Sequence, residues 1–168
     1  FRFDSTPPTG VAAGPARPPD HDGWYNRPFG VKWSGADALS GIASCSTASY
    51  GGPTSAATAV SGSCSDQAGN TSAAVGYAFK YDSTPPSVSV SLSRGPDSGN
   101  WYNHPVDFAA HGSDNLSGIA SCSSGTIPGS TSASCTDAAG NTASAGVGVQ
   151  YDASGPSIDS ITFDRPPD

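Results

Sequence analysis

Four cysteines are the residues of this chain with the most distinctive chemistry. Cys45 and Cys64 lie in the first half, and Cys122 and Cys135 occupy matching positions in the second half. Zinc sites built from cysteine usually contain a C-x-x-C pair, which this sequence lacks, and its three histidines do not recur in register. We therefore expect disulfides. Four cysteines allow three pairings, and the repeat favours Cys45–Cys64 and Cys122–Cys135.

Aspartate is the second chemical group that recurs along the chain. All 14 acidic residues are Asp. The matching sets are Asp66 with Asp137, Asp37 with Asp114, and Asp4 with Asp82 and Asp152. Calcium takes six to eight hard oxygen ligands, although no Glu is present for bidentate binding, and Asp before Gly-Asn is also a common turn former. No cofactor is required, and we keep Asp66, Asp82, Asp137 and Asp152 as candidate ligands of a structural calcium ion.

Catalytic patterns are absent from the sequence. Serine is abundant, but no G-x-S-x-G nucleophile elbow occurs. His104 and His111 have no counterparts in the first half, and a catalytic triad divided between two near copies would be unusual. We therefore expect no enzyme activity.

Aromatic residues and net charge bear on the kind of partner. Trp24, Tyr25, Trp101 and Tyr102 form two matching pairs that can pack at the end of a core or stack on a sugar. The net charge of −7 disfavours nucleic acid and anionic membranes, because both need clustered Lys and Arg. No apolar run is long enough to span a membrane. We keep the four aromatics as candidate ligand-binding residues, with core packing as the alternative.

The chain repeats itself, and this repeat organises the elements that must position these groups. Trp24-Tyr25-Asn26 recurs as Trp101-Tyr102-Asn103, residues 40–45 recur as 117–122, and residues 66–71 recur as 137–142. Apolar residues alternate with polar ones in residues 29–33, 75–81, 88–92, 106–110 and 145–151, which predicts antiparallel, half-buried strands. Ala-Gly-Asn at 68–70 and 139–141 predicts tight turns. No segment has a sustained helical period.

These motifs together resemble the immunoglobulin-like repeats of bacterial secreted and cell-surface proteins, many of which are adhesins. The resemblance rests on Trp-Tyr-Asn-x-Pro, Asp-x-x-Ser-Gly-Ile-Ala-Ser-Cys, Cys-x-Asp-x-Ala-Gly-Asn-Thr and Tyr-Asp-Ser-Thr-Pro-Pro. It implies an all-β fold of two tandem β-sandwich modules with one disulfide each. Residues 5–82 are expected to form module 1 and residues 83–152 module 2. Residues 1–4 would end a preceding module, and residues 153–168 would be a linker and the first strand of a following module.

The sequence as a whole predicts a non-enzymatic spacer or stalk in an extracellular array, secreted or attached to the cell surface. Disulfides indicate an exported protein. The expected partners are adjacent modules, with a glycan or surface protein as a further partner and with no nucleic acid or membrane insertion. Two alternatives stay open, namely a glycan- or protein-binding adhesin module and a subunit of an extracellular filament joined through exposed strand edges.

Overall fold

The computed structural model describes residues 2–162, in which every regular element is a β-strand and no helix is present. We refer to residues 5–82 as the first repeat and to residues 83–152 as the second repeat. The strands of the first repeat are β1 (Thr9–Pro15), β2 (Trp24–Tyr25), β3 (Phe29–Ala36), β4 (Ile42–Cys45), β5 (Thr47–Tyr50), β6 (Ser55–Gly62), β7 (Cys64–Asp66) and β8 (Val75–Tyr81).

The strands of the second repeat follow in the same order. They are β9 (Ser87–Leu92), β10 (Trp101–Tyr102), β11 (Val106–Ser113), β12 (Ile119–Cys122), β13 (Ser124–Ile127), β14 (Ser130–Asp137), β15 (Thr142–Gly148) and β16 (Gln150–Tyr151). The alternating segments of the sequence therefore form strands as predicted. The expected segment 145–151 is divided between β15 and β16.

Each repeat forms its own sheets. The first repeat contains the sheets β1-β3-β5, β2-β8-β6 and β4-β7, and the second contains β13-β11-β9, β12-β14-β15 and β10-β16. All pairs of longer strands are antiparallel, as predicted. The two-residue strands differ, because β2 pairs with β8 and β10 with β16 in parallel.

Each repeat also has its own hydrophobic core, which the alternation of its strands explains. In β3 the buried residues are Phe29, Val31 and Trp33, and in β11 they are Val106, Phe108 and Ala110. The residues between them face outward or are only partly buried, because successive side chains of a strand point to opposite faces. Both cores lie between strands of different sheets.

Two disulfides, Cys45–Cys64 and Cys122–Cys135, confirm the predicted pairing. In each repeat the two cysteines are direct partners on antiparallel strands, β4 with β7 and β12 with β14. The bonds close loops of similar position in the two repeats and point to an oxidising environment.

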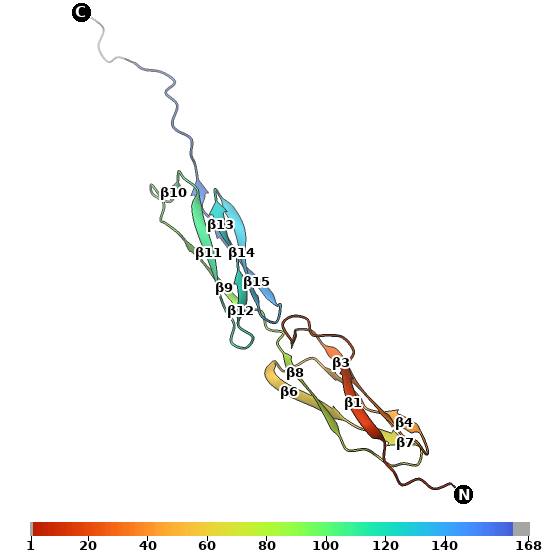
Figure 1. The fold of residues 1–168 in the computed structure, drawn as a ribbon. Helices are drawn as coiled ribbons and strands as arrows, with labels where there is room; N and C mark the ends of the chain where they lie inside the picture. The colour runs from red at the N-terminus through yellow and green to blue at the C-terminus, as the bar shows by residue number, and fades with distance from the viewer. Residues whose placement is uncertain (1, 163–168) are drawn as a thin grey trace, which may run out of the picture.

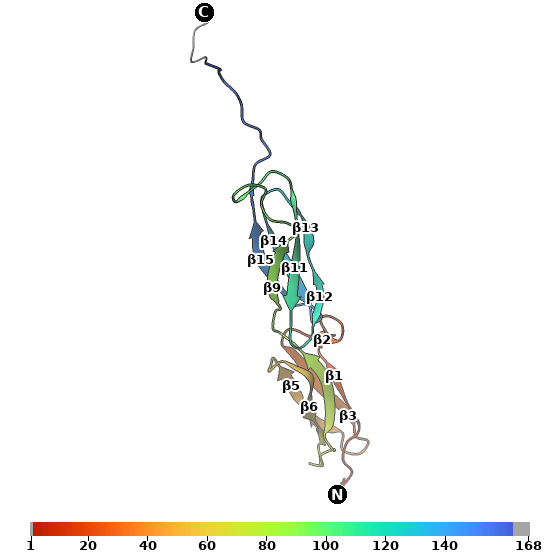
Figure 2. The same ribbon diagram turned by 90° about the vertical axis from the view of Figure 1, so that its left-hand side faces the viewer.

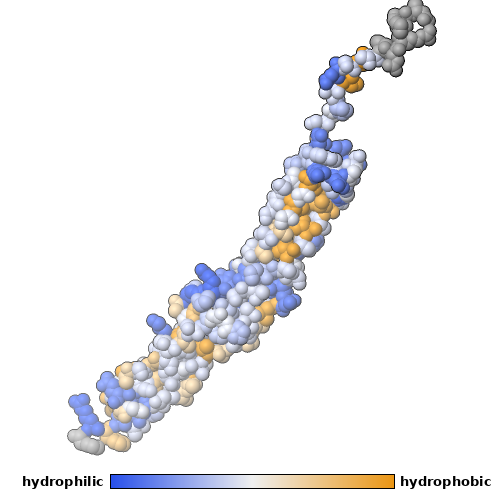
Figure 3. All heavy atoms as spheres, turned by 180° about the vertical axis from the view of Figure 1, so that it is seen from behind, coloured by the Kyte–Doolittle hydropathy of each residue, from blue (hydrophilic) through white to orange (hydrophobic). Residues whose placement is uncertain are grey.

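The two repeats lie end to end and give the described chain an elongated shape (Figures 1 and 2). On the face seen in Figure 3 the surface is mostly polar, and apolar side chains are more evident over the second repeat. Residues 2–4 and 153–162 contain no strand. Most of the strand expected to begin near Ser160 lies in residues 163–168, which together with residue 1 are outside the described part, and residues 160–162 themselves form no strand. No helix in residues 2–162 is long and apolar enough to cross a membrane.

Candidate functional site

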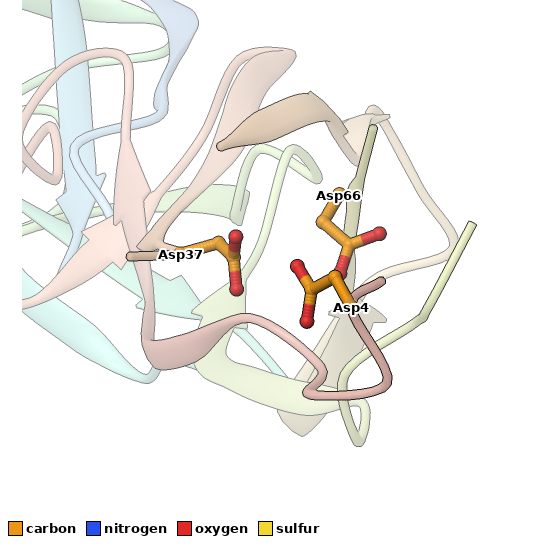
Figure 4. Close-up of side chains that lie close together, drawn as sticks. All are labelled: Asp4, Asp37 and Asp66. Atoms are coloured by element: carbon orange, nitrogen blue, oxygen red, sulfur yellow. The ribbon is translucent and has the colours of Figure 1, made fainter. Parts of the chain in front are cut away.

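Two clusters of three aspartates lie at equivalent places in the two repeats. The first consists of Asp4, Asp37 and Asp66 (Figure 4), and the second of Asp82, Asp114 and Asp137. In each cluster, one carboxylate oxygen from every residue lies within 4.8 Å of the others. Each cluster joins the segment entering the repeat to two loops of that repeat. We call these the first and the second carboxylate cluster.

The turn that follows β7 or β14 fixes one carboxylate of each cluster. Asp66 Oδ1 accepts hydrogen bonds from the amides of Ala68 and Asn70, and its Oδ2 accepts one from Asn70 Nδ2 at 2.8 Å. Asp137 is held in the same way by the amide and the side chain of Asn141. Gly69 closes the turn with a φ of 93°, where glycine is favoured. These aspartates form the turns that the sequence indicates, and the same hydrogen bonds orient their carboxylates.

A second loop contributes Asp37 or Asp114. Asp114 Oδ1 accepts hydrogen bonds from the amides of Leu116, Ser117 and Gly118. Burial raises the pKa of Asp114, but these backbone hydrogen bonds outweigh burial, so that its pKa lies below the usual value. Asp37 Oδ1 accepts the equivalent amide hydrogen bonds in the first repeat. The sequence shows that these residues match each other but gives no sign that they reach the other aspartates.

The third carboxylate differs most between the clusters. Asp82 is fully buried, and its Oδ1 accepts a hydrogen bond from the Thr84 amide at 3.0 Å. Its Oδ2 is buried and has no hydrogen-bond partner among the described residues. Asp4 is only partly buried, and both of its carboxylate oxygens accept backbone hydrogen bonds, from Thr6 and Ser40.

The second carboxylate cluster fits a hard divalent cation. A buried carboxylate oxygen without a partner costs roughly 1–3 kcal/mol or more, and a cation at this position would compensate that cost. The cluster offers only oxygen ligands, which suits calcium or magnesium rather than zinc. Asp82, Asp114 and Asp137 would supply three carboxylates, and water would complete the coordination shell.

The second cluster also marks the junction between the repeats. The Asp82 amide donates a hydrogen bond to Tyr25 O at 2.9 Å, while Asp82 O accepts one from Asn141 Nδ2 at 3.0 Å. Asp82 is therefore bonded to the first repeat on one side and to the second repeat on the other.

The segment around β2, residues 20–27, adds a second contact between the repeats. Asn26 Nδ2 donates to Ala139 O at 2.9 Å. His21 Nδ1 lies 3.2 Å from Ala138 O and donates to it when that nitrogen carries the proton. This segment, which we call the loop of residues 20–27 although it contains the two-residue strand β2, thus rests on the turn that carries Asp137.

Asp20 holds that loop in shape. Its carboxylate forms ion pairs with Arg17 and Arg27 and accepts a hydrogen bond from the Asn26 amide at 3.0 Å. Burial raises the pKa of Asp20, but the hydrogen bonds from Arg27, Asn26 and Arg17 outweigh burial and lower the pKa to about 2. Asp20 is consequently ionised and paired at neutral pH.

The structure separates the four candidate aromatics into two kinds. Tyr25 and Tyr102 are buried in the two cores, and Tyr25 stacks on Phe29 with ring centroids 3.6 Å apart. Trp24 is also buried, whereas the matching Trp101 is 53% exposed. Trp101 is the one aromatic of the four whose ring is open to a ligand.

Asp152 lies in neither cluster, at the far end of the second repeat. Its amide donates to Tyr102 O and its Oδ1 accepts a hydrogen bond from Ser154 N. The structure therefore brings together two of the four candidate calcium ligands, Asp82 and Asp137. Asp66 belongs to the equivalent first cluster. The third member of the second cluster is Asp114, which was not among the four candidates.

No family model matches the chain, and no curated protein matches it either. The resemblance to bacterial immunoglobulin-like repeats therefore stays a prediction from the sequence motifs.

Proposed function

We propose that this chain is a non-enzymatic structural spacer of an extracellular array, built from two tandem immunoglobulin-like β-sandwich modules, residues 5–82 and 83–152. The observation that carries the proposal is the junction at Asp82, whose amide bonds to the first repeat and whose carbonyl bonds to the second. A residue tied on both sides leaves little freedom for bending. Each module would then add a fixed increment of length.

The linker sequence supports the same function. Asp82 is followed by Ser83 and Thr84 and then by Pro85 and Pro86. Proline fixes φ and restricts the residue before it, so that this connection is short and stiff rather than a flexible tether. The two disulfides agree with an extracellular location, secreted or attached to a cell surface.

A divalent cation, with calcium as the first candidate, is proposed to strengthen the junction at the second carboxylate cluster. It would bind Asp82 of the linker together with Asp114 and Asp137 of the second repeat. The unpartnered, buried Oδ2 of Asp82 is the observation that favours it. The cation would join the linker to the second repeat without taking part in chemistry.

Solution scattering tests the spacer function. The proposal predicts one narrow, elongated distance distribution for the whole chain. The double variant His21→Ala, Asn26→Ala removes the loop contacts with Ala138 and Ala139, and should broaden the distribution while leaving both disulfide-bonded repeats folded. A distribution that is already broad in the unaltered chain would reject the spacer.

Melting with calcium and with chelator tests the cation. A ligand present at one hundred times its dissociation constant adds about 2.7 kcal/mol to stability, which corresponds to roughly 10–20 °C for a unit of this size. The Asp114→Asn variant keeps an oxygen for the loop amides and removes a negative charge from the cluster. Calcium should raise the melting temperature of the unaltered chain much more than that of this variant, and the absence of any rise would remove the cation from the proposal.

An adhesive function at the far end of the second repeat is the second candidate. It is favoured by the exposure of Trp101, in contrast to the buried Trp24. A glycan and cell-binding screen with Trp101→Ala as control tests it. Binding that is lost in this variant would add a ligand site to the spacer, and no binding above background would exclude the adhesive function.

A further inference from the structure

Equivalent ends of the two repeats differ consistently in exposure. In the second repeat Ala139 is fully buried and Leu116 is partly buried. In the first repeat the matching Ala68 is exposed, and the matching Leu39 is 71% exposed. Because the two ends have nearly the same sequence and the same turn geometry, the difference must come from what covers them.

The first repeat is what covers the end of the second. Asn26 and His21 lie over the Ala138–Ala139 turn, and a Cβ placed on Gly140 would be 3.3 Å from the Cβ of His21. Thr54 of the first repeat shares a small cavity with Leu116. The covering surface is therefore the far end of a repeat, and its principal part is the loop of residues 20–27.

The matching end of the first repeat has the same backbone carbonyl acceptors in its turn, but in the described part of the chain no side chains equivalent to His21 and Asn26 bind them. Gln67 and Ala68 correspond to Ala138 and Ala139, and among residues 2–162 no side chain donates a hydrogen bond to their carbonyls. A cavity of about 540 Å³ lies beside them, lined by Phe3, Leu39 and neighbouring residues. The turn is formed in the same way, since Asp66 holds the amides of Ala68 and Asn70.

We infer that this end of the first repeat, formed by Leu39, Gln67, Ala68 and Gly69, is a docking surface for the far end of another repeat of the same kind, joined through an Asp-Ser-Thr-Pro-Pro linker. The occupant presents a loop equivalent to residues 20–27. The inference rests on the proposed spacer function and extends it from the one junction observed to a second. Continuity with the observed junction agrees with this occupant, because the matching turn of the second repeat is covered by residues 20–27 of the repeat before it.

A duplicated chain tests the inference with native sequence at the new junction. Residues 1–82 followed directly by residues 5–168 place Asp82 before Ser5-Thr6-Pro7-Pro8, which repeats the natural Asp82-Ser83-Thr84-Pro85-Pro86. The methyl groups of Ala68, Leu39 and Ala139 are then observed by NMR with a soluble paramagnetic agent, which broadens the signals of exposed groups. The upstream copy of the first repeat serves as an uncovered reference.

Ala68 and Leu39 should each give two signals, one broadened as in the original chain and one protected several-fold, approaching the protection of Ala139 and Leu116. His21→Ala with Asn26→Ala in the upstream copy alone should remove that protection. If both copies of Ala68 remain fully exposed while Ala139 is protected, the docking inference fails and the spacer proposal stands.

Two further outcomes would locate the error elsewhere, in the observed junction or in the identity of the occupant. If Ala139 itself is broadened in the unaltered chain, the observed junction is not maintained in solution and the proposed function fails first. If Ala68 becomes protected in the unaltered chain as its concentration rises, with a dimer seen by sedimentation, the occupant is a second free copy and the inferred linked repeat is wrong.

Discussion

Asp20 provides the sharpest test of how the loop at the junction is held. Its carboxylate is paired with Arg17 and Arg27 and accepts a hydrogen bond from the amide of Asn26, whose side chain contacts the second repeat. Replacing Asp20 with Asn keeps the size and an acceptor oxygen but removes the charge. The variant should therefore lose stability in the first repeat and weaken the contact with the second.

The magnitude follows from the pKa. A fall in the pKa from 3.8 to about 2 corresponds to about 2.5 kcal/mol of preference for the charged form. Arg27 is 74% exposed, so solvent screening reduces the expected loss to about 1–2 kcal/mol. For a repeat of this size that is a fall in melting temperature of roughly 5–15 °C.

The dependence on pH has a definite sign. A carboxylate whose pKa is lowered by folding stabilises the protein at pH values above its unfolded pKa, here about 3.8, and that contribution is lost as the pH falls through about 2. Unfolding by denaturant at several pH values should therefore show the full difference between Asp20→Asn and the unaltered chain at pH 7. The difference should shrink below pH 4 and be small near pH 2.

Asp97→Asn is the matched control in the second repeat. Asp97 accepts a hydrogen bond from the Asn103 amide and pairs with Arg94, and these interactions lower its pKa, whereas within residues 2–162 no hydrogen bond joins its loop to the first repeat. This variant should lose less stability, because Asp97 is more exposed, and should leave Ala139 protected. An Asp20→Asn effect that is equally large at pH 2, or that Asp97→Asn reproduces at Ala139, would refute the reasoning.

Two further predictions concern the interior of the first repeat. Replacing both Cys45 and Cys64 by Ala opens a loop whose closure is worth about 3 kcal/mol, and denaturant unfolding without reductant should show a loss of that order, whereas an unchanged midpoint would contradict it. Gly62→Ala should cost about 1–3 kcal/mol, because its new Cβ would lie 2.6 Å from Trp33, while Gly76→Ala, with open space around it, should cost less than half as much. Equal midpoints for these two glycine variants would show that the core adapts to the extra methyl group.

The strands could be predicted well from the sequence, because the alternation of apolar and polar residues is contained within each strand. The buried series Phe29, Val31 and Trp33 can be recognised without knowledge of any partner strand. The cysteine pairing was accessible for a different reason, because the repeat limits the plausible combinations. Both predictions depend on short-range pattern or on self-similarity.

The carboxylate clusters could be predicted only in part, because they depend on contacts between distant loops. The strands β12, β13 and β14 lie between Asp114 and Asp137, and the sequence around neither residue indicates that the two meet. Trp101 shows a second limit. The matching Trp24 lies beneath the Lys80 ammonium, 4.9 Å from the ring centroid, whereas the strand partner of Trp101 is Gln150, which offers no cation.

The central claim is that the junction around Asp82 fixes the two repeats relative to each other. Residual dipolar couplings of backbone amides, measured for both repeats in one weakly aligned sample, test it most directly. The account predicts that a single alignment tensor fits the amides of residues 9–81 and 87–151 together. Two tensors of clearly different magnitude would mean that the repeats reorient independently and would contradict the account.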